Sequence, residues 1–317
     1  MQNNEQQNLR MNDKPKLGRD KLLGTLCIIG TTLCYGFIPS LSFLSFAAGV
    51  KTETLLFDKF LYAAVLMWAY ILIKRIPFKV DKDALKTMIA ICLSYIGLAT
   101  TLYLAFNYIS GSLATIVSFT FPPIIIAIEM ITKMEPVRLL KIVAVTLAMA
   151  GMVFIVGKPE MGGELIGIAF AFGTSICYVI YIMGLSAKSI KKMNSMVVAG
   201  YVLLSSAVVN FFRCIISGKP LFTSGFDQLG LILLLAIVCA FMAILLYCTG
   251  VKLVGPGNAA IINTFEPAVA CVLGYLLIGD ELTKNMLVGA ALIIVAVLLA
   301  NIPHGHKPVT KIKVDID

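Results

Sequence analysis

The sequence has 317 residues, of which 59% are hydrophobic and 14% are charged, and its mean hydropathy is +0.93. A soluble domain has a more even balance of apolar and polar residues, so this composition excludes a soluble globular protein and predicts a membrane protein. The net charge of +9 does not indicate a nucleic-acid partner, because most Lys and Arg residues lie in connections expected on one side of the membrane.

Apolar segments near the length that a bilayer demands recur ten times along the chain. They predict an all-α membrane protein with ten transmembrane helices, and the short connections leave no room for a catalytic domain, so no enzyme is expected. The positive-inside rule places both tails, residues 1–21 and 303–317, in the cytoplasm of a multi-pass cell-membrane protein. The first segment is too long for a cleavable signal. The ten segments are 22–46, 54–73, 84–107, 112–132, 139–157, 163–185, 194–216, 229–250, 257–278 and 285–302.

Tyrosines mark one face of the first segment and the matching face of the sixth. Tyr35 and Pro39 lie on that face of the first segment, and Tyr178 and Tyr181 lie on that of the sixth. A buried Tyr hydroxyl needs a hydrogen-bond partner, so these side chains are either clamps between helices or donors that line a cavity. Pro39, at midspan, predicts a helix break or a static kink.

Charged side chains stand near the ends of the second and fourth segments. Asp58 and Lys59 form a pair at the start of the second, where we favour a membrane anchor over a substrate site, because Lys can extend to the surface while Asp neutralises it. Glu129, near the end of the fourth segment, is interpreted as interfacial. No fixed basic residue is therefore expected at depth, which argues against strongly anionic cargo.

The fourth segment combines hydroxyl groups with prolines. Ser118 and Thr120 are candidates to line a polar hollow, and Pro122 and Pro123 predict a break in the helix at midspan. Such a break offers a point to bend about, or unpaired carbonyl groups.

The fifth and tenth segments carry small residues, including Ala144, Ala148, Gly151 and Gly289. Small residues suit close helix packing, within one chain or in a homodimer. No metal, cofactor or disulfide is expected, because the eight cysteines lie within the segments without a C-x-x-C pair and the two histidines stand in the C-terminal tail.

The ninth segment carries the one deeply placed acid. Glu266 lies roughly 14 Å along this helix, near the middle of a hydrocarbon layer of about 30 Å, where an ionised carboxylate costs about 3 kcal/mol. Pro267 leaves the carbonyl of Asn263 without its helical partner, and Asn263, Thr264 and Glu266 then offer polar groups beside that break. Glu266 is either a proton carrier or gating group, or a permanently protonated structural residue.

The two halves of the sequence repeat one another. Thr31 and Tyr35 recur 143 positions later as Thr174 and Tyr178, and the run with Thr120, Phe121 and Pro123 recurs 144 positions later as Thr264, Phe265 and Pro267. Nearly equal offsets predict duplication of a five-helix unit, residues 22–157 and 163–302. Because five is odd, the second copy enters the membrane from the opposite side, which gives two inverted repeats as in secondary transporters.

Residues 22–302 resemble the EamA-type transporters of the drug/metabolite transporter superfamily. The resemblance lies in the second repeat, in Gly255-Pro256, Phe265-Glu266-Pro267, Gly279-Asp280-Glu281-Leu282 and Gly289-Ala290-Ala291-Leu292-Ile293. The first repeat departs from the family pattern, with Met134-Glu135-Pro136-Val137 where a Gly-Glu-Arg-Leu-like turn is usual.

The resemblance implies a ten-helix inverted-repeat bundle with alternating access. It also implies a central cavity lined by the first, third, fourth, sixth, eighth and ninth helices. Members mostly export amino acids, metabolites or toxic compounds, although importers exist.

Two functions from different classes follow from the sequence. The favoured one is a secondary transporter that exports a small metabolite, amino acid or drug-like solute, with Glu266 coupled to protons or to gating. The alternative is a membrane scaffold or partner subunit without transport activity, in which the polar stripes only hold helices together. The sequence has no phosphate-binding Gly-rich loop, which argues against an ATP-driven pump.

Overall fold

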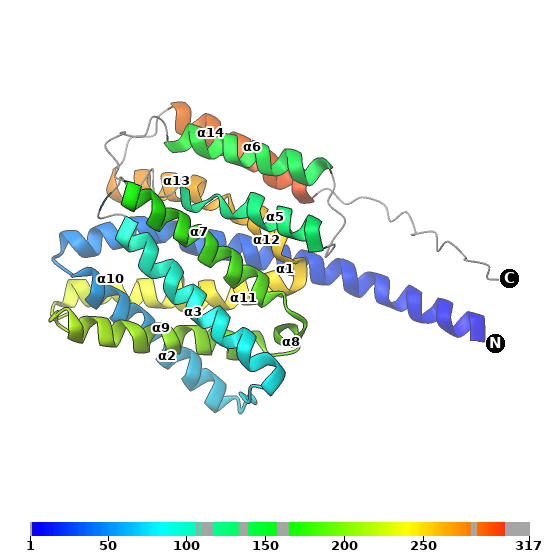
Figure 1. Ribbon diagram of the computed structural model, residues 1–317, viewed down its shortest axis with the longest axis horizontal. Coiled ribbons are helices and arrows are strands. Elements are labelled where there is room, and N and C mark those ends of the chain that lie inside the picture. Colours follow the sequence, from blue (N-terminus) through cyan, green and yellow to red (C-terminus); the bar gives the residue numbers. More distant parts are fainter. Residues whose placement is uncertain are drawn as a thin grey trace.

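The computed structural model describes residues 2–105, 108, 117–132, 139–156, 165–279 and 284–301, and every element in these ranges is a helix (Figure 1). This confirms the predicted all-α class. The predicted C-terminal tail and the turn at Met134–Val137 lie outside the described residues. The helices are α1 (Gln2–Ala47), α2 (Thr52–Ile73), α3 (Lys82–Ala105), α5 (Phe121–Thr132), α6 (Leu139–Val156), α7 (Leu165–Leu185), α8 (Lys188–Lys191), α9 (Ser195–Ile216), α10 (Phe226–Leu234), the π-helix η1 (Leu235–Met242), α11 (Ala243–Val254), α12 (Pro256–Asn263), α13 (Glu266–Ile278) and α14 (Lys284–Asn301).

Seven helical stretches in the described part are long and apolar enough to cross a membrane. They correspond to seven of the predicted segments, with α10, η1 and α11 forming one stretch and α12 and α13 another. The predicted fifth and tenth segments are α6 and α14, whose apolar stretches are shorter, and the described part of the fourth is α5. The chain is therefore a multi-pass membrane protein. The seven stretches are Arg19–Ala47, Thr52–Ile73, Lys82–Ala105, Leu165–Leu185, Ser195–Ile216, Phe226–Val254 and Pro256–Ile278.

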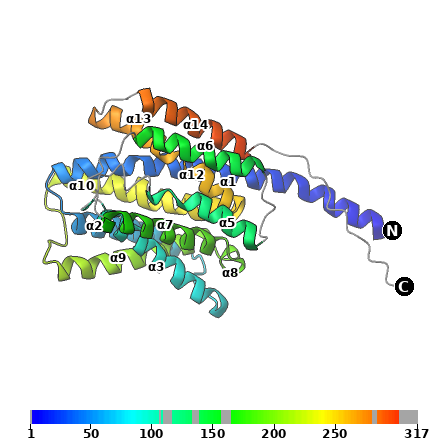
Figure 2. The same ribbon diagram turned by 45° about the horizontal axis from the view of Figure 1, so that its top comes forward.

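Helices from the two halves of the chain pack against each other in pairs. The most extensive contacts join α6 to α14, α3 to α7, α2 to α9 and α1 to α11. Figures 1 and 2 both place the α6–α14 pair along one edge of the bundle, while α2 and α9 lie away from that edge. Segments more than a hundred residues apart in sequence thus form the main helix–helix interfaces.

The α6–α14 pair shows why small residues occupy the predicted fifth and tenth segments. A Cβ atom on Gly151 would lie 2.6 Å from the carbonyl oxygen of Gly289, so the two backbones approach too closely for any side chain at position 151. Ala144 and Ala148 on α6 are fully buried. These small residues therefore serve helix packing within the chain.

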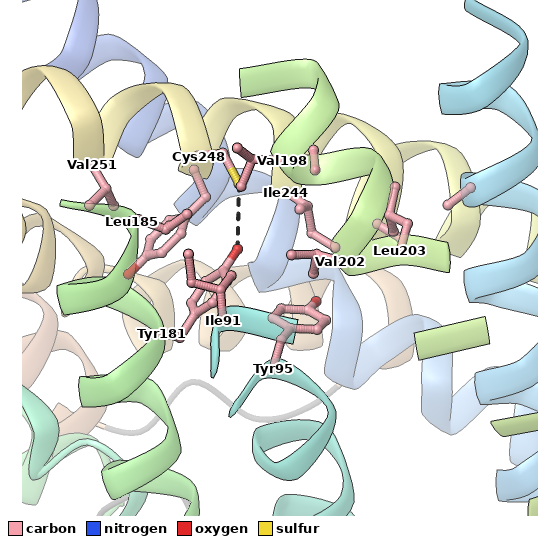
Figure 3. Close-up of a cluster of buried hydrophobic side chains, with 14 of the residues drawn as sticks. Ile91, Tyr95, Tyr181, Leu185, Val198, Val202, Leu203, Ile244, Cys248 and Val251 are labelled. Carbon is pink, nitrogen blue, oxygen red and sulfur yellow. Dashed lines mark hydrogen bonds between the residues drawn. The ribbon is translucent and has the colours of Figure 1, made fainter. Parts of the chain in front are cut away.

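The bundle interior is filled where α3, α7, α9 and α11 meet (Figure 3). Ile91 on α3, Tyr181 and Leu185 on α7, and Ile244 on α11 are at most 1% exposed. One polar contact crosses this region, at 3.6 Å between the Tyr181 hydroxyl and the Cys248 Sγ atom (Figure 3). This packing holds the sixth predicted segment against the third and eighth.

The helix is interrupted at two of the places where a proline predicts a break and is continuous at the third. The helix is interrupted at Thr264 and Phe265, directly before Pro267 in the first turn of α13, and a turn at Phe119 and Thr120 precedes α5 with Pro122 and Pro123 in its first turn. Pro39 instead lies inside α1, which continues from Gln2 to Ala47. Proline removes one N–H from the helical ladder, and the hydrogen bonds of neighbouring turns are enough to continue the helix there.

Candidate functional site

The break in the ninth predicted segment has the same local structure as the break in the fourth. The Thr264 hydroxyl donates to the carbonyl of Ile261 at 2.6 Å, and the Thr120 hydroxyl donates to the carbonyl of Val117 at 2.7 Å. The backbone N–H of each Thr donates to the same carbonyl, at 3.1 and 3.2 Å. Each threonine therefore closes a tight turn that ends one helix before a proline-containing helix begins.

The second break differs from the first because it carries an acid. Glu266 opens α13, whereas the matching position 144 residues earlier is Pro122. The Glu266 Oε2 atom accepts a long hydrogen bond of 3.3 Å from Asn263 Nδ2. Glu266 keeps some accessible surface, although it interacts electrostatically with side chains from α3, α7, η1 and α11. Its carboxyl group therefore faces the bundle interior and is only weakly satisfied there.

Asn263 supplies the other polar atoms of this break. Its side chain also interacts electrostatically with the hydroxyl group of Tyr178. The Asn263 Oδ1 atom is buried and has no hydrogen-bond partner among the described residues. An unpaired buried carbonyl oxygen is costly, so this atom offers an acceptor to a donor from outside the chain.

Five tyrosines from four helices surround this region, and we call them the central tyrosine cluster. The hydroxyl groups of Tyr35 and Tyr95 interact electrostatically. The rings of Tyr181 and Tyr247 stack with centroids 5.8 Å apart, and Tyr178 stacks on Phe121 at 4.6 Å. Electrostatic interactions link Glu266 to the hydroxyl groups of three members of the cluster, Tyr95, Tyr178 and Tyr247.

The predicted tyrosines occupy two kinds of environment. Tyr35 and Tyr181 are 4% and 1% exposed, and Tyr181 is engaged with Cys248, so it acts as a clamp between helices. Tyr178 keeps partial exposure beside Asn263 and Glu266. Of the three, Tyr178 therefore has the position expected of a donor facing a solute.

The predicted hydroxyl residues of the fourth segment hold helices together. Ser118 Oγ donates to the carbonyl of Ala171 at 3.3 Å, and the hydroxyl groups of Thr120 and Ser175 are hydrogen-bonded with their oxygens 2.9 Å apart. Both contacts join the fourth predicted segment to α7. Thr264, on the ninth segment, is fully buried in the turn that it closes.

Glu129 is buried, and its interpretation as an interfacial residue is wrong. Its Oε1 atom accepts the N–H of Gly257 at 2.8 Å, and Lys141 Nζ lies 3.6 Å from its Oε2 atom. Gly257 stands at the start of α12, where unpaired N–H groups attract a carboxylate. A Cβ atom at position 257 would overlap this carboxyl group. Nearness to a helix end suggested the membrane surface, but the end of α5 is covered by α12 and α6.

Sequence reasoning did not place Tyr95 and Tyr247 in the site. Tyr247 had a signal, because it repeats Tyr103 at the 144-residue offset, yet Tyr103 itself is not part of the central tyrosine cluster. Tyr95 had no such signal, since its contacts with Tyr35 and Tyr181 depend on how α3 packs between α1 and α7. Among the described residues, no group of three or more His, Cys, Asp or Glu side chains could hold a metal ion.

Comparison with known proteins supports the resemblance drawn from the second repeat. Residues 165–302 match the EamA-like transporter family. An uncharacterized transporter of Clostridium kluyveri is 22% identical over 205 residues, which cover 62% of this chain and 66% of that protein, just under two thirds of its length. The uncharacterized transporter YoaV of Bacillus subtilis is 20% identical over 298 residues, covering 90% of this chain and 98% of YoaV.

The same architecture occurs in a solved protein. The crystal structure of a protein with 16% sequence identity superposes with a TM-score of 0.77, covering 88% of this chain and 97% of the other. At this identity the likeness concerns the fold alone.

Proposed function

Because residues 165–302 form an EamA-like transporter domain, we propose that the chain is a secondary transporter that moves a small metabolite, amino acid or drug-like solute across the cell membrane. In this proposal it works by alternating access as an exporter, rather than as an enzyme or a scaffold. The observation that carries the proposal is Glu266, a carboxyl group inside a broken helix of a multi-pass bundle, with partial exposure and one long hydrogen bond.

The proposed architecture is ten transmembrane helices in two inverted five-helix repeats. The matching hydrogen bonds at Thr120 and Thr264 support it. Thr31 and Thr174 also match, since each donates to the carbonyl four residues earlier and each contacts a helix of the opposite half, at Ala243 and at Thr101 respectively.

The pairing of the helices independently supports the two proposed inverted repeats. Exchanging the two repeats turns the α1–α11 pair into the α7–α3 pair, and it maps α2–α9, α5–α12 and α6–α14 onto themselves. A bundle related by a pseudo-twofold axis requires this pattern, and an arbitrary packing of ten helices does not. In this arrangement both tails lie in the cytoplasm.

The proposed path of the solute passes Glu266, Asn263 and Tyr178. Asn263 Oδ1 and the Glu266 carboxyl group offer polar atoms that other described side chains leave partly or wholly unused. Glu266 is also the proposed coupling group, because a carboxyl group held away from bulk water binds a proton more readily than one in water. Protons as the coupling ion and a homodimeric assembly remain parts of this proposal.

The test compares the metabolites released by cells that produce the wild-type chain, the Glu266→Gln variant or no protein. We expect at least one small solute to accumulate outside wild-type cells several-fold more than outside cells without the protein, and the Glu266→Gln variant to remove most of that difference. The matched control is Glu53→Gln, which neutralises an acid in the first turn of α2. Equal release from all cells would reject the transporter, and full activity of Glu266→Gln would remove Glu266 from its mechanism.

A further inference from the structure

Lys59 is buried inside the bundle, which corrects the membrane anchor expected from the sequence. It is 5% exposed and lies about 10 Å along α2 from the start of that helix. Its neighbour Asp58 is engaged elsewhere, because its Oδ2 atom accepts the N–H and the hydroxyl of Thr223, both at 3.0 Å. Asp58 and Lys59 are neighbours in sequence but do not form an ion pair. The Asp58 carboxylate is instead hydrogen-bonded to the loop before α10.

The Lys59 ammonium has no counter-ion in the part of the chain that the structure describes. No acidic side chain there lies within 4.0 Å of its Nζ atom. The Lys59 Nζ atom lies over the ring of Phe60, 5.2 Å from its centroid. A buried ammonium without an opposite charge is costly, so a negatively charged ligand would stabilise Lys59 in this position.

The surroundings of Lys59 lead to the candidate solute path. The π-helix η1 packs against α2 and α1, and π-helical turns within longer helices occur often at functional sites. Cys239, in the middle of η1, interacts electrostatically with both Lys59 and Glu266. The two charged side chains therefore flank the same irregular turn.

Aromatic rings continue from Lys59 into the central tyrosine cluster. Phe60 contacts Tyr95 edge to face with ring centroids 6.0 Å apart, and Tyr95 contacts Tyr181 at 5.2 Å. Phe60, Tyr95 and Tyr181 are 1%, 7% and 1% exposed, so these rings form a packed apolar wall beside the Lys59 side chain.

We infer that Lys59 binds the carboxylate of a small organic anion. A single ammonium suits one carboxylate, whereas a phosphate group is usually held by several basic groups or by the fork of an arginine. The other buried or partly buried basic groups nearby are engaged: Lys252 donates to the carbonyl of Met193, and Arg213 donates to Thr100 and Asn210. This inference rests on the proposed transport function and names the class of its cargo.

The test measures the melting temperature of the purified full chain in detergent with three ring compounds of similar size. Sodium benzoate carries the carboxylate, benzamide is neutral and benzylammonium chloride is cationic, each at matched ionic strength. Because a ligand that binds only the folded state raises the melting temperature, we expect saturable stabilisation by benzoate alone. Lys59→Arg keeps the charge and should retain the effect, whereas Lys59→Met should weaken benzoate binding at least tenfold. Lys51→Met removes an exposed lysine just before α2 and serves as the control.

Three results would overturn the inference: no stabilisation of the folded wild type by benzoate, equal stabilisation of Lys59→Met, or stabilisation by benzylammonium instead. If Lys59→Met fails to fold, the melting temperatures of the wild type and of Lys59→Arg with each of the three compounds still test whether the site prefers a carboxylate. If benzoate binds but cells release no solute, the proposed anion site at Lys59 stands and the proposed transport function is rejected. If cells release a solute but benzoate does not bind, only the proposed anion site at Lys59 is rejected.

Discussion

Glu129 and Glu266 are acids on the fourth and ninth predicted segments, and they have opposite surroundings. Glu129 is fully buried, accepts a short hydrogen bond from Gly257 and faces Lys141. Glu266 keeps accessible surface and has one long hydrogen bond from Asn263. The first arrangement fixes a charge in place, and the second leaves a carboxyl group able to change partners. We infer that Glu129 serves stability and Glu266 serves transport.

The difference arises because the two acids do not occupy equivalent positions of the two proposed repeats. The residue 144 positions after Glu129 is Leu273, and the residue 144 positions before Glu266 is Pro122. The contact between Glu129 and Gly257 therefore ties the two halves together at one place that has no counterpart in the other half.

Removing the carboxyl group of Glu129 is expected to have the largest effect on stability. Glu129→Ala leaves Lys141 without this counter-ion and the N–H of Gly257 without its acceptor, which should lower the free energy of unfolding by about 4 kcal/mol. The measurement is the unfolding transition of the purified protein in detergent. A loss below about 1 kcal/mol would contradict the stabilising role of Glu129.

Adding a methyl group beside Glu129 should lower the free energy of unfolding less than removing its carboxyl group does. Gly257→Ala places a methyl group against the carboxylate and should lower the free energy of unfolding by about 2 kcal/mol. The control is Gly230→Ala, because a Cβ atom on Gly230 meets nothing within 4 Å. The same unfolding assay checks both variants. Equal stability of the two would show that α5 and α12 separate easily at this contact.

Neutralising Glu266 should have the smallest effect on stability. Glu266→Gln keeps the shape of the side chain and loses at most one weak hydrogen bond, so the free energy of unfolding should change by about 0.5 kcal/mol or less. Solute release should nevertheless fall, as described above. A loss of stability as large as that of Glu129→Ala would instead make Glu266 a structural residue.

Much of the fold was predictable from residue patterns because the bilayer constrains segment length and composition. The helical class, the close packing of Gly151 and Gly289, and the breaks before Pro123 and Pro267 all follow from local sequence. The helix around Pro39 was not predictable, because a proline can be accommodated within a helix or end it, according to the surrounding packing.

The candidate site was predictable only in part. Asn263 and Glu266 are neighbours in one segment, so their contact depends on helical spacing alone. The environments of Lys59 and Glu129 depend on which helix covers them, and that information lies in segments far away in the sequence. A charged residue near a segment end therefore looked interfacial in both cases, and tertiary packing decided otherwise.

The pairing of α6 with α14 has a consequence for the order of assembly in the cell. The fifth predicted segment is synthesised well before its main partner, α14. Until α14 is synthesised, the closely fitting surface around Ala144, Ala148 and Gly151 lacks the helix that fills it in the folded bundle. The α6–α14 interface therefore forms late in synthesis, and a shortened chain that lacks α14 would leave the small-residue surface of α6 uncovered.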